Sequence, residues 1–286
     1  MLRTSNPAMK NNPFGEPQTW DRFGDSDLAS EAKSKPVRTP GVMTLQGTIN
    51  KSFFLLAICI VTAVFAWDLT TPIKDGVMVQ PTLNPWFTAL GGVLVAFVLS
   101  LITTRKPQIA PGTAPAIAVA EGVFVGAISA SYASWFASSD METGGLVPDH
   151  TIVLQAALCT FGVFAAMLTA YTTRLIKPTE KFKSIVVSAT LGIMFLYIGS
   201  ILMSLFGMRM PLLHDASPIG IAISAVIIVV AALNLVLDFE FIETGVKNKI
   251  PTWGEWFGGF TLLITLVWLY FEFLRLLWKI RTLVDD

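Results

Sequence analysis

Seven long apolar windows dominate this chain of 286 residues and separate its polar segments. A membrane-spanning helix needs about 20 consecutive and mainly apolar residues, and the windows approach or meet that length. They cover residues 52–67, 84–103, 114–138, 151–171, 184–206, 217–240 and 256–278. Charged residues make up only 14% of the chain, against roughly 25% in soluble domains. The pattern predicts an all-α polytopic membrane protein, a seven-transmembrane helix bundle.

The N-terminal segment has a different composition from the rest of the chain. Residues 1–45 are rich in Asn, Pro, Ser, Asp and Lys and carry too few apolar side chains to form a core, so they are predicted to be a disordered cytoplasmic tail. The first apolar run begins at Ser52, too late for a signal peptide, and is therefore expected to remain in the protein. Residues 46–286 are predicted to form the membrane domain.

The basic residues near the windows predict an orientation. Counting from Lys33, twelve Lys and Arg residues fall on the N-terminal side of the membrane and five on the other side. The positive-inside rule then predicts a cytoplasmic N-terminus and an external C-terminus. The 20 basic and 20 acidic residues offer no basic face for nucleic acid. Cys59 and Cys159 lie within apolar windows and are interpreted as small buried hydrophobes. The chain lacks the common hydrolase, phosphate-loop and metalloprotease motifs, so an enzyme is not predicted.

Acidic residues inside the windows are the strongest candidates for function, because burying one costs ~2.5–3.5 kcal/mol on insertion scales. Glu121, Asp238, Glu240 and Glu272 are in this position, with no basic residue in the middle of a window to neutralise them. Such a set favours a cation or a proton over an anion. Counted along straight helices, Glu272 is expected near the outer surface, paired with Arg275 or Lys279.

Depth groups the other candidates in one inner layer, where Glu121, Asp238, Glu255 and Arg105 are all expected. Asn234 and Asp238 are four residues apart and share a helix face, whereas Glu240 points elsewhere. Asp238 is the main candidate for an ion pathway or pH sensor, and Arg105 for a latch. The alternative is that Asp238 only ends a helix at the interface, and that Glu121 is hydrogen-bonded without a function.

A stripe of small residues runs along the third window. Its members, spaced four residues apart, are Gly122, Gly126, Ala130 and Ser134. Small residues let two helices approach closely, so packing within the bundle is the favoured interpretation. Contact with another membrane protein is the alternative.

Several ordered segments resemble the Bax-inhibitor (transmembrane BAX inhibitor motif) family, specifically its bacterial branch. They are Ala114–Ser129, Gln155–Phe164 and Ala232–Ile242, together with the opening Ser5-Asn-Pro7. The resemblance implies a seven-helix bundle in a bacterial plasma (inner) membrane that acts as a pH-sensitive calcium leak. It also implies that a sixth-span aspartate pairs with a seventh-span aspartate and that an arginine latches the closed state.

Asp238 matches the sixth-span aspartate of that family, but the seventh-span partner has two alignments. Matching Leu269-Tyr-Phe-Glu-Phe273 to the family pattern makes Glu272 the partner, whereas matching the ends of the helix puts Thr265 or Leu266 there. Depth favours the second alignment.

Two functions are carried forward. The first is a passive pathway for Ca²⁺ lined by Asp238 and Glu121, where Ca²⁺ is a transported ion held transiently at Asp238 and no resident cofactor is expected. The second is a non-conducting regulator of membrane proteases or stress-response partners, which would use the tail and the small-residue stripe. The expected partners are the lipid bilayer, the calcium ion and other membrane proteins. Proton-coupled transport is a third reading, weakened because no internal repeat is found.

Overall fold

The computed structural model describes residues 41–74, 77–139, 145–206 and 215–285. Most of the predicted tail therefore lies outside the described residues, and so do the loop positions 140–144 and 207–214. From Gly41 onward the chain forms one compact unit.

Seven helices in the described part of the chain are long and apolar enough to cross a membrane, which confirms the predicted all-α fold of seven spans. They are α2 (Leu45–Thr70), α3 (Pro85–Arg105), α4 (Ala110–Trp135), α5 (Thr151–Thr172), α6 (Glu180–Leu205), α8 (Pro218–Lys247) and α9 (Trp253–Asp285). A short 3₁₀ turn, η3 (Pro107–Ile109), leads from α3 into α4.

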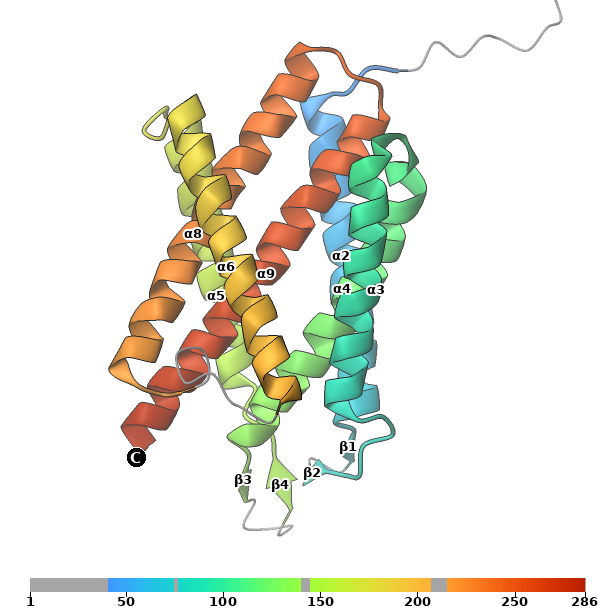
Figure 1. Ribbon diagram of the computed structural model, residues 1–286. Coiled ribbons are helices and arrows are strands. Elements are labelled where there is room, and N and C mark those ends of the chain that lie inside the picture. The colour runs from blue at the N-terminus through green and yellow to red at the C-terminus, as the bar shows by residue number, and fades with distance from the viewer. Residues whose placement is uncertain (1–40, 75–76, 140–144, 207–214, 286) are drawn as a thin grey trace, which may run out of the picture. The chain divides into compact units, whose positions relative to one another are not determined.

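Two small antiparallel hairpins lie in the connections between helices. Strand β1 (Ile73–Lys74) pairs with β2 (Val77–Met78) between α2 and α3, and β3 (Ser138–Ser139) pairs with β4 (Leu146–Val147) between α4 and α5. Figure 1 shows both hairpins at the end of the bundle opposite the α8–α9 connection. Consecutive helices alternate in direction, so the α2–α3 and α4–α5 connections lie at one end of the bundle and the α8–α9 connection at the other.

Capping side chains explain where several helices begin. Thr44, Asn84, Thr179 and Ser217 each accept a hydrogen bond from a backbone N–H in the first turn of the helix that follows. Side chains of this kind satisfy donors that a helix N-terminus otherwise leaves free. Pro85 and Pro218 follow two of these caps, where a missing N–H costs nothing.

The first helix is longer than the predicted window 52–67. It begins at Leu45, after the N-cap Thr44, and the Thr48 hydroxyl donates to the Thr44 carbonyl over 2.9 Å. Thr48 therefore fits within a helix that the hydropathy pattern truncates. Helix α9 likewise continues past the predicted residue 278 to Asp285.

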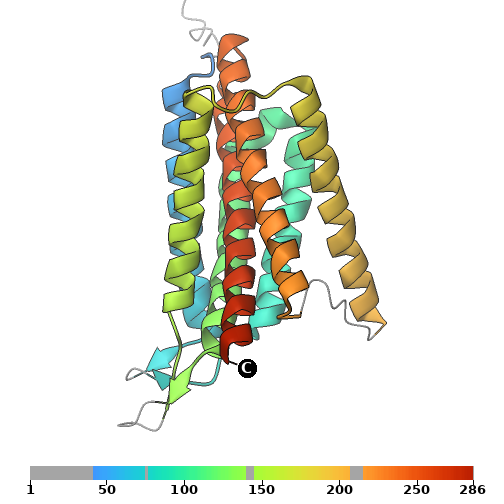
Figure 2. The same cartoon turned by 90° about the vertical axis from the view of Figure 1, so that its left-hand side faces the viewer.

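Helix α9 is the centre of the bundle. It contacts α2, α4, α5 and α8, and its residues take part in all three apolar clusters of the core. The turned view in Figure 2 shows α9 running between helices on both sides. Helix α4 is largely buried beside it, whereas α5 and α6 leave most of their surface outside the protein. Cys59 on α2 is buried as predicted, but Cys159 is exposed because α5 turns only a narrow face to the core.

Candidate functional site

Asp238 of α8 and Thr265 of α9 meet inside the bundle. The Thr265 hydroxyl donates a hydrogen bond of 2.7 Å to Asp238 Oδ2, and Thr265 is itself buried. The short connection between Lys247 and Trp253 turns α9 back along α8 and so brings the two residues together. Asp238 lies nine residues before the end of α8, about 14 Å into the bundle at 1.5 Å per residue. It is therefore a partly buried carboxylate whose partner is a neutral donor.

Asn234 extends this contact towards α6. Its amide nitrogen donates to Thr190 Oγ1 over 2.8 Å and to the Val230 carbonyl over 2.9 Å. Asn234 lies one turn before Asp238 on α8, on the same face. We call Thr190, Asn234, Asp238 and Thr265 the Asp238 layer. Its oxygen ligands come from three helices and include one carboxylate.

The Asp238 layer has the chemistry of a weak cation site. Carboxylate, hydroxyl and amide oxygens are the hard ligands that Ca²⁺ prefers, but a full shell takes six to eight of them. No group of three or more His, Cys, Asp or Glu residues that could hold a metal ion is found in the described ranges. A cation would therefore be held briefly in this layer.

Glu121 lies at a similar depth but on the other side of α9. It is 93% buried on α4, and no hydrogen bond or ion pair is found for its carboxylate within the residues that the structure describes. Helix α4 packs against α2 and one side of α9, while α8 packs against another side of α9. The predicted inner layer is therefore divided, with Glu121 and Asp238 separated by the central helix.

Arg105 does not act as a latch on Asp238 in this structure. It ends α3, its surface is exposed, and no ion pair joins it to a carboxylate in the described part of the chain. The physical reason is the position of α3, which packs on α4 at the side of the bundle remote from α8. Arg105 and Asp238 were expected at the same depth in the membrane, but equal depth does not bring two residues on separate helices together.

Glu272 is fully buried instead of lying at the outer surface. Its carboxylate forms the predicted ion pair with Arg275 and also accepts hydrogen bonds from Tyr197 of α6 and from Trp268, the latter over 3.3 Å. The expectation of a surface position was wrong because α9 is central and continues thirteen residues beyond Glu272. Thr265 is seven residues away, about 10 Å along the helix, so Glu272 is not the partner of Asp238.

Two buried basic residues lie near Glu272, so this acid is not without neighbouring cations as the sequence suggested. Arg275 is 7% exposed, and Lys279 is fully buried and donates to the Gly220 carbonyl over 2.9 Å and to Ser224 Oγ over 3.0 Å. These contacts join the end of α9 to the start of α8. Apolar patterning could not reveal them, because Arg275 and Lys279 resemble an ordinary basic helix end in the sequence.

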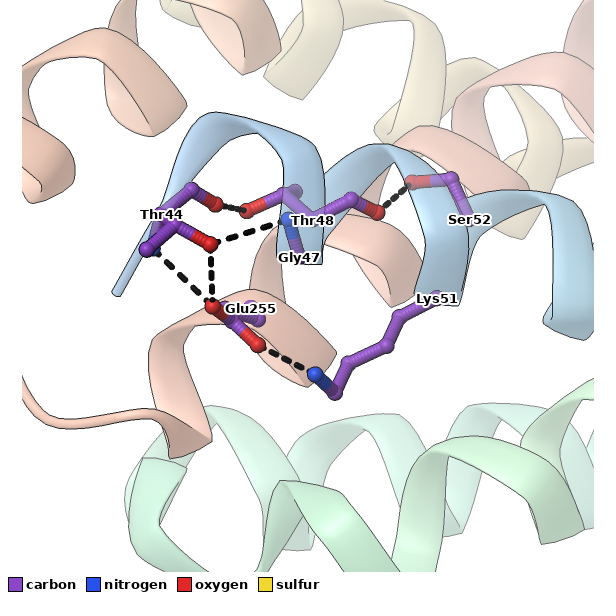
Figure 3. Close-up of polar contacts among 6 residues, drawn as sticks. All are labelled: Thr44, Gly47, Thr48, Lys51, Ser52 and Glu255. Atoms are coloured by element: carbon purple, nitrogen blue, oxygen red, sulfur yellow. Dashed lines mark hydrogen bonds and ion pairs between the residues drawn. The ribbon is translucent and has the colours of Figure 1, made fainter. Parts of the chain in front are cut away.

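A second polar cluster fixes the start of α9 to the start of α2, as Figure 3 shows. Glu255 accepts hydrogen bonds from the Thr44 backbone N–H (2.9 Å) and hydroxyl (2.8 Å), and it forms an ion pair with Lys51. Met43 N–H also donates to the Ile250 carbonyl over 2.7 Å. Glu255 is thus committed to this cluster and is not a member of the Asp238 layer. Glu240 is also paired, with Lys183 of α6 over 2.6 Å.

Asp149 connects the start of α5 with the end of α9. It accepts a hydrogen bond from the Thr151 N–H over 2.8 Å and forms an ion pair with Arg281. Desolvation raises the pKa of Asp149, but the hydrogen bonds from Arg281 and Thr151 outweigh it and lower this pKa overall. A lowered pKa means that the pair stabilises the fold above the ordinary aspartate pKa of about 4 and loses that effect as pH falls.

We therefore expect Asp149→Asn to reduce stability at neutral pH by up to about 1 kcal/mol, because the pair is partly exposed. The difference from the unmodified chain should shrink to zero as the pH falls below the lowered pKa. Thermal unfolding in mild detergent across a pH series measures it. The same substitution in an Arg281→Gln background should have a smaller effect, and a loss that is equal at all pH values would contradict the assignment.

One comparison with known proteins matches nearly the whole chain. The model of a family described as Bax inhibitor 1 like matches residues 6–282. No curated protein matches the chain.

Proposed function

The chain belongs to the Bax inhibitor 1 like family, and from this membership and the Asp238 layer we propose that it is a passive, pH-sensitive calcium leak across a membrane. Its seven apolar helices make it a multi-pass membrane protein. The observation that carries the proposal is the hydrogen bond from Thr265 to Asp238, which holds one carboxylate inside the bundle. No ion pair to Asp238 is found among the described residues. Such a group can attract a cation and release it again.

The ligands of the Asp238 layer support transient passage. Asn234 uses its amide nitrogen for Thr190 and Val230, and no hydrogen bond to its Oδ1 is found in the described part of the chain. Asn234 Oδ1 can therefore serve as a neutral ligand beside the Asp238 carboxylate. Glu121 supplies a second carboxylate on the α4 side of α9 in this proposal. No latch role is assigned to Arg105.

The proposed pH dependence follows from the charge on Asp238. An ionised carboxylate attracts Ca²⁺, whereas the protonated acid has no charge and can donate a hydrogen bond of its own. The leak should therefore fall as the solution becomes more acidic. The Thr265 hydroxyl donates to this carboxylate and is therefore expected to influence how the leak depends on pH.

Calcium flux into dye-loaded liposomes tests the proposal. We expect Asp238→Asn to reduce flux about tenfold, equivalent to roughly 1.4 kcal/mol, and to remove its dependence on pH. Thr265→Val should alter the pH dependence of the flux, because the Asp238 carboxylate loses its hydrogen-bond donor, and Thr265→Ser should restore it. Glu240→Gln is the matched control, because Glu240 lies on the same helix but is paired with Lys183. Flux that Asp238→Asn leaves unchanged between about pH 6 and pH 8 would remove Asp238 from the mechanism.

The sequence asymmetry of basic residues supports an orientation for the leak. We propose a cytoplasmic N-terminus and an external C-terminus in a bacterial plasma membrane, which follows from the excess of Lys and Arg beside the N-terminal side. The Asp238 layer then lies in the cytoplasmic half. A non-conducting regulator is less well supported, because Gly122 and Gly126 of its expected docking stripe already face α2.

A further inference from the structure

An apolar cleft of about 620 Å³ opens on the side of the bundle away from the Asp238 layer. Residues from α2, α4, α5 and α9 line it, and Leu266, Val267 and Tyr270 of α9 contribute to its wall. Its volume lies within the range of pockets that hold small organic ligands. The cleft is therefore large enough for a ligand and is distinct from the proposed ion site.

The rim of the cleft faces the bilayer. Ile60 and Val64 on α2 and Phe161 on α5 line it and are 52%, 66% and 45% exposed. All three lie within membrane-spanning helices, so the exposed surface meets lipid hydrocarbon instead of water. A ligand can thus enter sideways from the membrane.

The hydroxyl groups inside the cleft already have hydrogen-bond partners. Ser129 Oγ and the Tyr270 hydroxyl share a hydrogen bond of 2.7 Å, and Ser129 also donates to the Val125 carbonyl. The Thr160 hydroxyl is satisfied by the Ala156 carbonyl over 2.8 Å. With these groups occupied, the cleft favours a hydrocarbon chain.

One end of the cleft is polar and aromatic. Asp68 and Trp67 line it near the end of α2, 23 and 22 residues after Leu45, which places them about 35 Å along the helix at the level of lipid headgroups. Asp68 is exposed, and no ion pair is found for its carboxylate within the described ranges. The His150 ring lies 5.3 Å from the Trp67 ring and helps to hold the indole. A carboxylate beside an indole is suited to a cationic head.

We propose that this cleft binds a hydrocarbon chain of a membrane lipid whose headgroup carries an amine, with the ammonium against Asp68 and Trp67. The apolar lining holds the chain, and the unpaired carboxylate at headgroup depth selects the amine. A lipid with a negative headgroup and no amine is disfavoured at the same position, because Asp68 repels it.

Quenching of tryptophan fluorescence by brominated lipid chains tests the proposal. The full chain is reconstituted in vesicles that contain brominated phosphatidylethanolamine or brominated phosphatidylglycerol with the same chains. The difference from a Trp67→Phe variant isolates the signal of Trp67. We expect phosphatidylethanolamine to occupy the cleft about fivefold more tightly, an effect of the size expected for one charge near a membrane surface. Equal quenching by the two lipids, or a preference for phosphatidylglycerol, would overturn the proposal.

Two variants separate the role of the cleft from that of the headgroup. Ala157→Phe fills the cleft from α5 and should reduce Trp67 quenching to the level of bulk lipid, whereas Leu158→Phe, on the 64% exposed face of the same helix, should leave it unchanged. Asp68→Asn alters only a surface group and should abolish the lipid preference while chain quenching persists. Identical results for the two α5 variants would refute a chain in the cleft. Quenching that weakens as the protein becomes denser in the vesicle would instead identify a second copy as the occupant.

Discussion

Replacing Glu272 by leucine is expected to destabilise the bundle by about 3–5 kcal/mol, because Arg275 would stay buried without its carboxylate. Arg275 is 7% exposed and its guanidinium lies over the rings of Tyr197 and Phe271, with centroid distances of 5.2 and 5.8 Å. Its Nε–H group already lacks an acceptor in the described part of the chain. Glu272 is the carboxylate that pairs with Arg275 in the described residues, so its loss leaves the buried charge uncompensated and destabilises the fold.

A double-mutant cycle distinguishes this ion pair from ordinary packing. Arg275→Leu alone should also destabilise, since it leaves a buried carboxylate, but Glu272→Leu with Arg275→Leu should cost much less than the sum of the two. Thermal and denaturant unfolding in mild detergent supply the measurements. Additive effects of the two substitutions would show that the pair contributes nothing as a pair.

The ion pair between Glu180 and Lys183 is the matched control for that cycle. It has the same spacing of three residues on a helix, but the Glu180 side chain is 90% exposed. Exposed pairs of this kind contribute less than about 1 kcal/mol, so Glu180→Leu should change stability little. The contrast between the two glutamates would show that burial, and not the spacing, gives Glu272 its importance.

The apolar pattern predicted the helices well because hydrophobic length is what a membrane span requires. It misplaced the start of α2, where the Thr48 hydroxyl binds a backbone carbonyl of its own helix, and the end of α9, where Lys279 is enclosed by α8. A hydropathy window scores such residues as polar, so the predicted helix ends before them. The partner of each polar side chain decides whether the helix continues.

Counting residues predicted the depth of each site residue along its helix, but not which helices lie next to one another. Counting residues correctly favoured Thr265 over Glu272 as the residue that meets Asp238. The same counting placed Glu121 and Arg105 in that layer, although α9 and α4 separate them from α8. Rise per residue fixes depth, but the order of helices around the bundle depends on contacts far apart in the sequence. Thr190 and Tyr197 of α6 were missed for that reason, since neither carries a local signal.

The stripe of small residues on α4 lets α2 pack closely against it, so enlarging a residue of the stripe should destabilise the bundle. A Cβ atom at Gly126 would lie 2.9 Å from the Ala63 Cα and also against the Ala63 carbonyl, and one at Gly122 would meet the Cys59 carbonyl. These neighbours are backbone atoms, which cannot turn aside as a flexible side chain would. We expect Gly126→Ala to cost about 1–3 kcal/mol through overpacking, and Gly126→Val to cost more.

Adjacent glycines on α3 give this prediction its control. A Cβ at Gly92 would lie 2.8 Å from the Ala120 carbonyl oxygen and the Phe124 nitrogen of α4. At Gly91 no atom of the described residues would lie within 4 Å of an added Cβ. Gly92→Ala should therefore destabilise the bundle as Gly126→Ala does, while Gly91→Ala should be neutral or stabilise it by up to about 1 kcal/mol through helix propensity. Thermal unfolding in detergent decides between them. If all three alanines behaved alike, close backbone approach would not be what holds α2 and α3 on α4, and the stripe would again be free to serve a partner outside the bundle.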